Sequence, residues 1–537
     1  MVGCIRCSSS YGPCILSHFP ILAQYSISNW DLQDIGIMDF IDGIVHGFSV
    51  AFQFQNLYLC FLGVLFGTFT GVLPGFGPTA AIALLIPLTL GLDPVSSIIL
   101  LAGIYYGSMY GGSTTAILVN IPGEAASVIT CVEGYPMAKA GRAGPALGMC
   151  AFGSLIGGTF SILGLMFVAP PLSKVALKFG PTEFFSIMLL GLTIITYVST
   201  GPVTKALMMA ALGLILACVG IDIISGLPRL TFGCDYLLDG IPLVPLAMGL
   251  FGISEVLSNL ERSLKIQVYS KTVKNILPSL KDWAVSIWPI LRGSLIGFFS
   301  GLIPGGGPVI GAFSSYAVEK KLSKYPEKYG TGVIEGVAAP ETANNASVQA
   351  AFVPLFTLGI PVTPCIAVLF GAFLVHGIVP GPLLISENPD MFWGVVASMY
   401  LGNIMLLVLN LPLINLWVRI VRIPYVFLFP LVLLFCLVGA YSLRYSTADI
   451  YFMLIFGILG YVMRKFGYEG APLILGFILG PLVERALRQS LIISHGDFTT
   501  FLRSPISLIA LILAALLLLS NLLPFLRSRR PALGISE

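Results

Sequence analysis

The sequence predicts an all-α polytopic membrane protein, and three observations support that prediction. Of the 537 residues, 56% are hydrophobic and only 10% are charged, whereas soluble domains carry roughly 25% charged residues. Charge-free runs are long, for example residues 43–92 and 342–386. A glycine- and proline-rich interruption occurs twice in such surroundings. Because one spanning helix needs about 20 apolar residues, we expect about 12 transmembrane helices in two internal repeats, each containing one broken helix.

The interruption is the stretch Gly67-Thr-Phe-Thr-Gly-Val-Leu-Pro-Gly-Phe-Gly-Pro78, and its second copy is Gly297-Phe-Phe-Ser-Gly-Leu-Ile-Pro-Gly-Gly-Gly-Pro308. A gap-free alignment superimposes four glycines, two prolines and one phenylalanine. Proline removes a backbone donor and glycine weakens helical order, so each copy should end one helix and begin another. The backbone groups freed there must be buried in protein or face water, because hydrocarbon cannot satisfy them.

The chain divides into three regions. Residues 1–37 contain no span-length apolar run, and we expect a poorly structured N-terminal extension, or an upstream extension whose translation really begins at Met38. Residues 38–265 form the first transmembrane repeat half, and residues 266–537 form the second. The hydrophilic linker between them, Glu261–Lys281, is rich in lysine and arginine and is therefore expected in the cytoplasm.

A weaker repeat follows each break. Residues 107–122 align with residues 346–361 at an offset of 239, with only Ser347, Ile360 and Pro361 identical to their counterparts. In the first copy, Gly111-Gly112 and three hydroxyl residues precede Ile121-Pro122-Gly123-Glu124, which has the composition of unwound backbone. Paired interruptions in two halves of a chain are the best sequence-level pointer to the binding site of a secondary transporter.

Residues suited to an anionic substrate gather at these interruptions. Half-helix N-termini present free amide donors and roughly half a positive charge, and Pro78 and Pro308 fit the first turn after each break. A pair of simple packing kinks is the alternative interpretation. The predicted substrate-binding residues are Pro74, Gly75, Gly77, Pro78, Ser113, Thr114, Thr115, Pro304, Gly305, Gly306, Gly307, Pro308, Asn344 and Asn345.

The most polar patch inside an apolar region is Glu341-Thr-Ala-Asn-Asn-Ala-Ser347. An acid and two amides at membrane depth are costly and should face the protein interior or water. Their oxygens could hold a sodium ion, so Glu341, Thr342 and Ser347 are candidates for ion coupling, with a helix cap at the interface as the alternative. His376 and His46 are candidates for proton coupling, against an ordinary interfacial position.

Other classes of function lack their motifs. There is no Gly-x-Ser-x-Gly elbow, His-Glu-x-x-His or P-loop lysine motif, so we expect no enzyme, and uphill transport would use an ion gradient. No basic stripe with interleaved aromatic residues indicates a nucleic-acid partner. The pair Cys4 and Cys7 has no second pair at zinc-ligand spacing. No cofactor or bound metal is expected beyond a co-transported Na⁺ or H⁺.

Several motifs together resemble the large membrane subunit of the tripartite tricarboxylate transporter family. The resemblance runs from about residue 38 to about residue 526 and is carried by five segments in order: Gly71-Val-Leu-Pro-Gly-Phe-Gly-Pro78, Gly134-Tyr-Pro-Met-Ala-Lys139, Gly301-Leu-Ile-Pro-Gly-Gly-Gly-Pro308, Ala339-Pro-Glu-Thr-Ala-Asn-Asn345 and His376-Gly-Ile-Val-Pro-Gly-Pro382.

The resemblance implies a multi-pass protein of the bacterial inner membrane that works with a small four-span membrane subunit and a periplasmic substrate-binding protein. It also implies symport, with Na⁺ or H⁺, of carboxylates such as tricarboxylates, dicarboxylates and aromatic acids. Two alternatives stay open, a stand-alone ion-coupled organic anion symporter and a passive anion channel. The sequence names neither the carboxylate nor the coupling ion.

Overall fold

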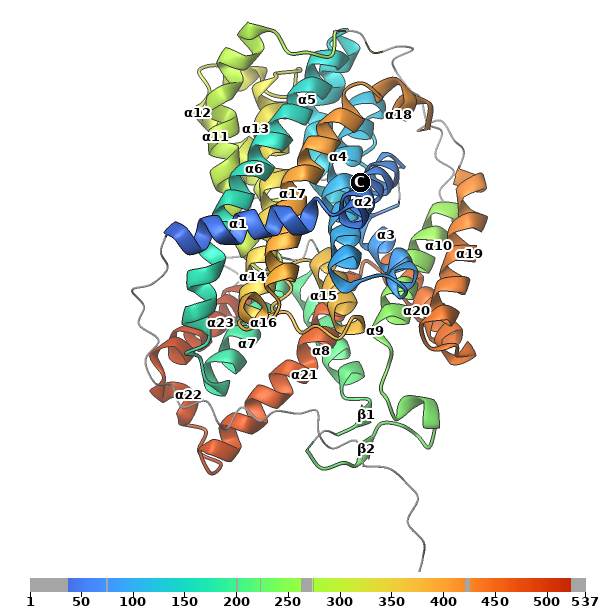
Figure 1. Cartoon of the computed structure of the whole chain (residues 1–537), viewed down its shortest axis with the longest axis vertical. Coiled ribbons are helices and arrows are strands. Elements are labelled where there is room, and N and C mark those ends of the chain that lie inside the picture. Colours follow the sequence, from blue (N-terminus) through green and yellow to red (C-terminus); the bar gives the residue numbers. More distant parts are fainter. Residues whose placement is uncertain are drawn as a thin grey trace, which may run out of the picture.

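The computed structural model describes the chain as a bundle of helices with one pair of two-residue strands (Figure 1). The residues described are 37–73, 76–198, 201–222, 224–261, 273, 275–420 and 425–522. The expected N-terminal extension and most of the expected linker lie outside the described residues. Within them, the predicted all-α class is confirmed.

The elements of the first half, from N- to C-terminus, are α1 (Ile37–Ala51), α2 (Phe54–Val72), α3 (Pro78–Leu85), α4 (Pro94–Val119), α5 (Val128–Lys139), α6 (Ala143–Ala176), α7 (Pro181–Val198), α8 (Val203–Ala217), β1 (Gly220–Ile221), β2 (Pro228–Arg229), α9 (Leu243–Ala247) and α10 (Ser254–Glu261). One turn of 3-10 helix, Ala125–Ser127, leads into α5, and a π-helical turn, Met248–Ile253, joins α9 to α10.

The elements of the second half are α11 (Leu280–Leu302), α12 (Gly307–Leu322), α13 (Glu335–Ala350), α14 (Phe352–Leu358), α15 (Pro364–Val375), α16 (Leu384–Glu387), α17 (Pro389–Asn410), α18 (Ile414–Ile420), α19 (Tyr425–Arg444), α20 (Thr447–Lys465), α21 (Gly470–Ile493), α22 (Thr500–Arg503) and α23 (Pro505–Leu522).

Among the described residues, seven helical segments are long and apolar enough to cross a membrane. They are α2, α6, the segment from α9 to α10, α11, α17, α20 and α21. The helices α4 and α13 are not among them, although nearly all of their side chains are buried inside the protein. A polytopic membrane protein is therefore supported, and the count of about 12 spans stays a prediction.

Both predicted breaks are present. The helix α2 ends at Val72 and α3 begins at Pro78, while α11 ends at Leu302 and α12 begins at Gly307. In the second break, the φ angles of Gly305 and Gly307 are +75° and +44°, in the left-handed region that favours glycine. The glycines and prolines of these motifs therefore interrupt the helices where the sequence predicts.

The helix before each break packs against the second helix after it in the chain, through three glycines spaced four residues apart. In the first half, these glycines of α2 lie against backbone carbonyls of α4, and in the second half those of α11 lie against carbonyls of α13. The pairs are Gly63 with Leu100, Gly67 with Ile104, Gly71 with Ser108, Gly293 with Ala339, Gly297 with Ala343 and Gly301 with Ser347. Small residues allow this close approach of two helices.

The two halves also exchange contacts. The helix α6 packs on α13, and α17 packs on α4, so each long helix covers the central helix of the other half. Likewise α3 packs against α15, and α12 packs against α5 and the turn that precedes it. The helix α1 lies across this bundle (Figure 1), with its Phe40 ring stacked on Phe167 of α6 and edge-on to Trp393 of α17.

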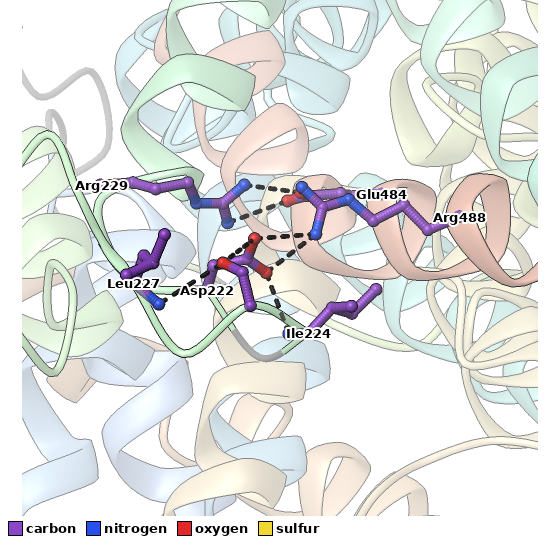
Figure 2. Close-up of polar contacts among 7 residues, drawn as sticks. Asp222, Ile224, Leu227, Arg229, Glu484 and Arg488 are labelled. Carbon is purple, nitrogen blue, oxygen red and sulfur yellow. Dashed lines mark hydrogen bonds and ion pairs between the residues drawn. The ribbon is translucent and has the colours of Figure 1, made fainter.

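The segment between α8 and α9 is held to α21 by charges (Figure 2). Asp222 accepts hydrogen bonds from the Arg488 guanidinium at 2.8 and 2.9 Å, and Arg229 donates to Glu484 at 2.6 and 3.2 Å. The backbone N–H of Ile224 and then Arg488 stabilise the ionised carboxyl of Asp222, which lowers its pKa. Every charge in this network therefore has an opposite charge beside it.

Candidate functional site

Four short helices that follow interruptions meet at their N-terminal ends. Thr79, at the start of α3, lies 3.1 Å from the sulfur of Cys365, at the start of α15. On the opposite side, Ala126 before α5 shares an apolar cluster with Ala312 of α12. In Figure 1, α5 and α12 lie above α3 and α15. The N-terminal ends of these helices therefore lie close together inside the bundle, where their dipoles favour negative charge.

At the first break, the N-terminus of α3 already meets a carboxylate. The backbone N–H of Gly77 donates to Glu255 Oε1 at 3.1 Å, and Arg464 lies 3.6 Å from the other oxygen of Glu255. Pro78 occupies the first position of α3. An open cavity of about 570 Å³, lined by polar and charged residues of α10 and α20, adjoins Glu255. The candidates Pro74 and Gly75 lie outside the described residues.

At the second break, the loop packs on the connection between α14 and α15. The N–H of Gly305 donates to the carbonyl of Val362 at 2.8 Å, and Gly307 lies against the methyl group of Thr363. Gly306 donates to Ile303 within the turn at 3.0 Å. The remaining candidates here are Pro304, which is partly buried in that turn, and Pro308, which is buried in the first turn of α12.

The carboxylate of Glu341 is the centre of a buried polar cluster between α4, α5, α6 and α13. Ser113 donates to its Oε2 at 2.6 Å, Cys150 donates to the same oxygen at 3.2 Å, and Thr130 donates to Oε1. Glu341 is only 1% exposed. The structure thus joins Ser113, a predicted substrate-binding residue, to Glu341, a predicted ion-coupling residue, and adds two donors that the sequence did not indicate.

A second carboxylate approaches this cluster from the loop before α5. Glu124 caps the turn there by accepting from the N–H of Ala126 at 2.5 Å, and its other oxygen accepts from the amide of Asn344 at 3.3 Å. Asn344 lies one helical turn after Glu341 on α13, and the two carboxylates repel each other electrostatically. None of the ion pairs found in the described part of the chain includes Glu124 or Glu341.

Amide oxygens beside these carboxylates lack donors. Asn344 and Asn345 are each 1% exposed, yet their Oδ1 atoms have no hydrogen-bond partner among the described residues. The nitrogen of Asn345 donates to the Ser154 hydroxyl at 2.7 Å, so the side chain itself is fixed. Buried acceptors without donors are rare in proteins, and carboxylate and amide oxygens are the ligands that hard cations prefer.

A neutral pair, which also joins the two halves, occupies the position that the repeat relates to this charged pair. At the same offset of 239, Glu124 corresponds to Thr363 and Asn344 to Tyr105. Thr363 caps α15 by accepting from the N–H of Ile366 at 3.2 Å, as Glu124 caps its own turn, and its hydroxyl lies 3.3 Å from that of Tyr105. Glu124 interacts electrostatically with Tyr105, so the charged pair and the neutral pair lie near each other.

Several predicted site residues have other roles. The helix α4 continues through Gly111, Gly112 and Ser113 to Val119, so the expectation of unwound backbone there is wrong, and only Asn120–Glu124 leave the helix. The hydroxyl of Thr115 donates a hydrogen bond within its own helix, to the Gly112 carbonyl at 2.8 Å.

The other polar candidates bond locally or at a distance from Glu341. Thr342 donates to the carbonyl of Ala338 at 2.7 Å, and Ser347 lies 2.7 Å from the Ser300 hydroxyl, joining α13 to α11. Thr114 is buried. The ring of His376 lies 2.9 Å from Thr89, and His46 pairs with exposed Asp390 at 2.5 Å. These two histidines do not contact the carboxylate cluster.

From the sequence, Glu124 was expected only as part of an unwound stretch and not as a site residue, and Thr130 and Cys150 were not indicated at all. One signal for Glu124 was present, because it lies two residues after the Ile-Pro pair that aligns with Ile360-Pro361. An acidic residue at a repeated helix start, in a chain with so few charges, is a candidate site residue on the same grounds as Glu341. Thr130 and Cys150 carry no such signal, since only the packing of α5 and α6 brings them to Glu341.

Comparison with known proteins assigns the family. Residues 57–475 match the tripartite tricarboxylate transporter TctA family. The chain belongs to this family. The match spans both breaks and both polar pairs, so the resemblance in the five sequence motifs is confirmed.

Two relatives from Agrobacterium vitis are similar to this TctA-family chain. The first, an uncharacterized 52.8 kDa protein in the TAR-I ttuC' 3' region, is 48% identical over 503 residues, which is 93% of this chain and all of the relative. The second, an uncharacterized protein in the TAR-II ttuC' 3' region, is 49% identical over 245 residues, 46% of this chain and all of the relative. No solved structure matches the chain.

Proposed function

We propose that this chain is the translocating subunit of a binding-protein-dependent symporter that imports carboxylates, such as tricarboxylates, across the bacterial inner membrane, driven by a Na⁺ or H⁺ gradient. The observation that supports this most strongly is the convergence of the N-terminal ends of α3, α12 and α15 with the turn before α5. Free amides and helix dipoles attract an anion without a full positive charge nearby.

Broken helices whose N-termini face a substrate carboxylate are a recurring feature of secondary transporters. Here the carboxylate of Glu255 accepts from Gly77, so the amide at the first break can bind a carboxylate group. The predicted substrate residues at the breaks and on α13 stay proposals.

We also propose the two-repeat arrangement for the whole chain. Its support is the register of the glycine contacts, in which three pairs in one half match three in the other at offsets of 230 and 239. The helices α6 and α17 each pack on the central helix of the other half, so the long helices of the two repeats are interlocked. The moving unit would instead combine the short helices of both halves.

The proposed partners are a small four-span membrane subunit and a periplasmic substrate-binding protein, because membership of the TctA family implies a system of several subunits. On the same membership we propose that the chain transports carboxylates and is not an enzyme. The bilayer is the remaining partner, and no nucleic acid is proposed.

Reconstituted transport tests this function. The chain, inserted in liposomes with both proposed partners, should take up radiolabelled citrate or another carboxylate against its concentration gradient when an inward Na⁺ or H⁺ gradient is imposed. Gly305→Leu should abolish uptake because Gly305 has a positive φ and donates to Val362. Gly377→Leu is the matched control, since Gly377 also has a positive φ, +74°, but open space around it.

Three results would contradict the proposal. Normal uptake by Gly305→Leu, with Gly377→Leu equally active, would remove the second break from the transport path. Flux that only follows the carboxylate gradient, whatever ion gradient is imposed, would favour a passive anion channel. Full uptake without either partner protein would favour a stand-alone symporter.

A further inference from the structure

Resting on the proposed function, we infer that Glu124, Glu341 and Asn344 form a sodium site that must be filled before the anionic substrate binds. The three residues come from both halves of the chain, Glu124 from the loop before α5 and the other two from α13. The site therefore lies across the contact between the halves, beside the converging helix ends.

The first argument is charge. Two carboxylates interact within the bundle, Glu341 almost fully buried and Glu124 partly buried, and no described lysine, arginine or histidine pairs with either. Elsewhere in the described part of the chain, buried acids are either paired with an arginine, as Asp449 is with Arg444 and Glu319 with Arg292, or surrounded by several hydrogen-bond donors, as Glu133 is. Two neighbouring carboxylates in a low-dielectric interior are costly unless a proton or a cation neutralises them.

The second argument is the unpaired acceptors. Asn344 donates its amide hydrogen to Glu124, while its Oδ1, on the same planar amide, has no donor. The Oδ1 of the adjacent Asn345 also accepts no hydrogen bond from the described residues. A proton on one carboxyl could serve only one of these acceptors, whereas a sodium ion binds several oxygens at once, and oxygens of this kind suit a hard cation.

The position of the site explains coupling. Glu124 interacts electrostatically with Tyr105 and Cys365, at the place where α15 begins, so its negative charge opposes an anion bound to the helix ends. A sodium ion at Glu124 cancels that repulsion. The ion therefore binds first and raises the affinity for the carboxylate, and by reciprocity the carboxylate raises the affinity for sodium.

The position that the repeat relates to this site does not need a cation. Tyr105 and Thr363 form a neutral hydrogen-bonded pair whose hydroxyls satisfy each other. One cation site, rather than two related by the repeat, follows from this difference.

Thermal unfolding of the purified chain in detergent, without partners or substrate, tests the site. Sodium chloride replaces choline chloride at constant ionic strength, so only the specific ion changes. The melting temperature of the wild type should rise by about 5 °C at saturating sodium, and potassium should have little effect. Glu124→Gln, Glu341→Gln and Asn344→Leu should each abolish the rise.

A matched control is Asn410→Leu. Asn410 is buried on α17 and also has an unpartnered Oδ1, but it bonds Leu406 and no carboxylate, so its variant should keep the sodium response. Asn344→Leu keeps both carboxylates and remains informative where a glutamate variant fails to fold.

A wild type without a sodium response, or with a response to pH alone, overturns the sodium site. A sodium response that survives in Glu124→Gln or Asn344→Leu overturns it as well. The proposed function is tested separately, by uptake in liposomes. If uptake is sodium-driven but the variants keep the sodium-dependent rise in melting temperature, only the assignment of the ion site is wrong. If only the wild type shows that rise but no carboxylate is taken up, only the proposed function is wrong.

Discussion

Two polar pairs that the repeat relates to each other each join the two halves of the molecule, and the pairs differ in charge. Glu124 with Asn344 joins the loop before α5 to α13, and Thr363 with Tyr105 joins the loop before α15 to α4. In both pairs the first residue caps the helix that follows it. A neutral pair is therefore sufficient to cap and bridge at this place in the fold.

The carboxylate in the first pair is not required by architecture, since threonine performs the same capping in the second. Its presence brings an uncompensated charge beside Glu341 and leaves Asn344 Oδ1 without a donor. Intramembrane acids are expensive and indicate function. The backbone at these two positions is repeated, but the charge is not. The position that carries the charge is therefore the one we assign to the ion.

The largest expected effects test the equivalence on which this comparison rests. Gly71→Leu and Gly301→Leu should each prevent stable folding, because their side chains would meet backbone carbonyls of Ser108 and Ser347. Overpacking typically costs 1–3 kcal/mol, and roughly 3 kcal/mol or more is expected at a backbone contact. Yield and melting temperature after purification measure the loss.

Gly91→Leu is the control for these variants, since Gly91 has open space around it. Similar losses of yield and melting temperature at the two contact glycines, with none at Gly91, would support the equivalence of the two halves. A severe loss in only one half would contradict that equivalence.

The next effect concerns the charged residue itself. Glu124→Gln should lower sodium-driven carboxylate uptake on the order of 100-fold, because a hydrogen bond or contact to a charged group is worth up to about 3 kcal/mol. Thr363→Val should lower it less than about tenfold, since a lost helix cap costs roughly 1 kcal/mol. Initial rates in liposomes give both values, and equal losses would contradict the assignment of the ion site to the charged pair alone.

A smaller effect is expected from Tyr105→Phe, which removes only the hydroxyl that faces Thr363 at 3.3 Å. A neutral hydrogen bond contributes about 1 kcal/mol, so the variant should be slightly less stable and should keep its response to sodium. Thermal unfolding with and without sodium measures both properties. Loss of the sodium response would show that the neutral pair also contributes to the ion site.

The smallest effect is expected at the paired charges outside the bundle. Asp222 has a lowered pKa because Ile224 and Arg488 stabilise its carboxylate, so its contribution to stability is present above about pH 4 and is lost as the pH falls toward the folded pKa. Asp222→Asn should therefore destabilise the chain modestly at neutral pH, less at acidic pH, and leave the sodium response intact. A lost sodium response would mean that any removed carboxylate has that effect.

The sequence predicted the helical membrane class, both breaks and the position of Glu341 in the protein interior, because these depend on composition and on local backbone chemistry. It misjudged Gly111–Thr115, since a run of small residues is compatible with close helix packing as well as with unwound backbone, and contacts with α2 decide the matter. Thr130 and Cys150 could not be predicted, because their approach to Glu341 depends on how α5 and α6 pack.

Equilibrium binding of ²²Na⁺ to the purified chain tests the central claim most directly. The account predicts saturable binding to the wild type that survives in Thr363→Val and disappears in Glu124→Gln and Asn344→Leu. Saturable binding that is unchanged in Glu124→Gln, or no saturable binding in the wild type, would contradict it.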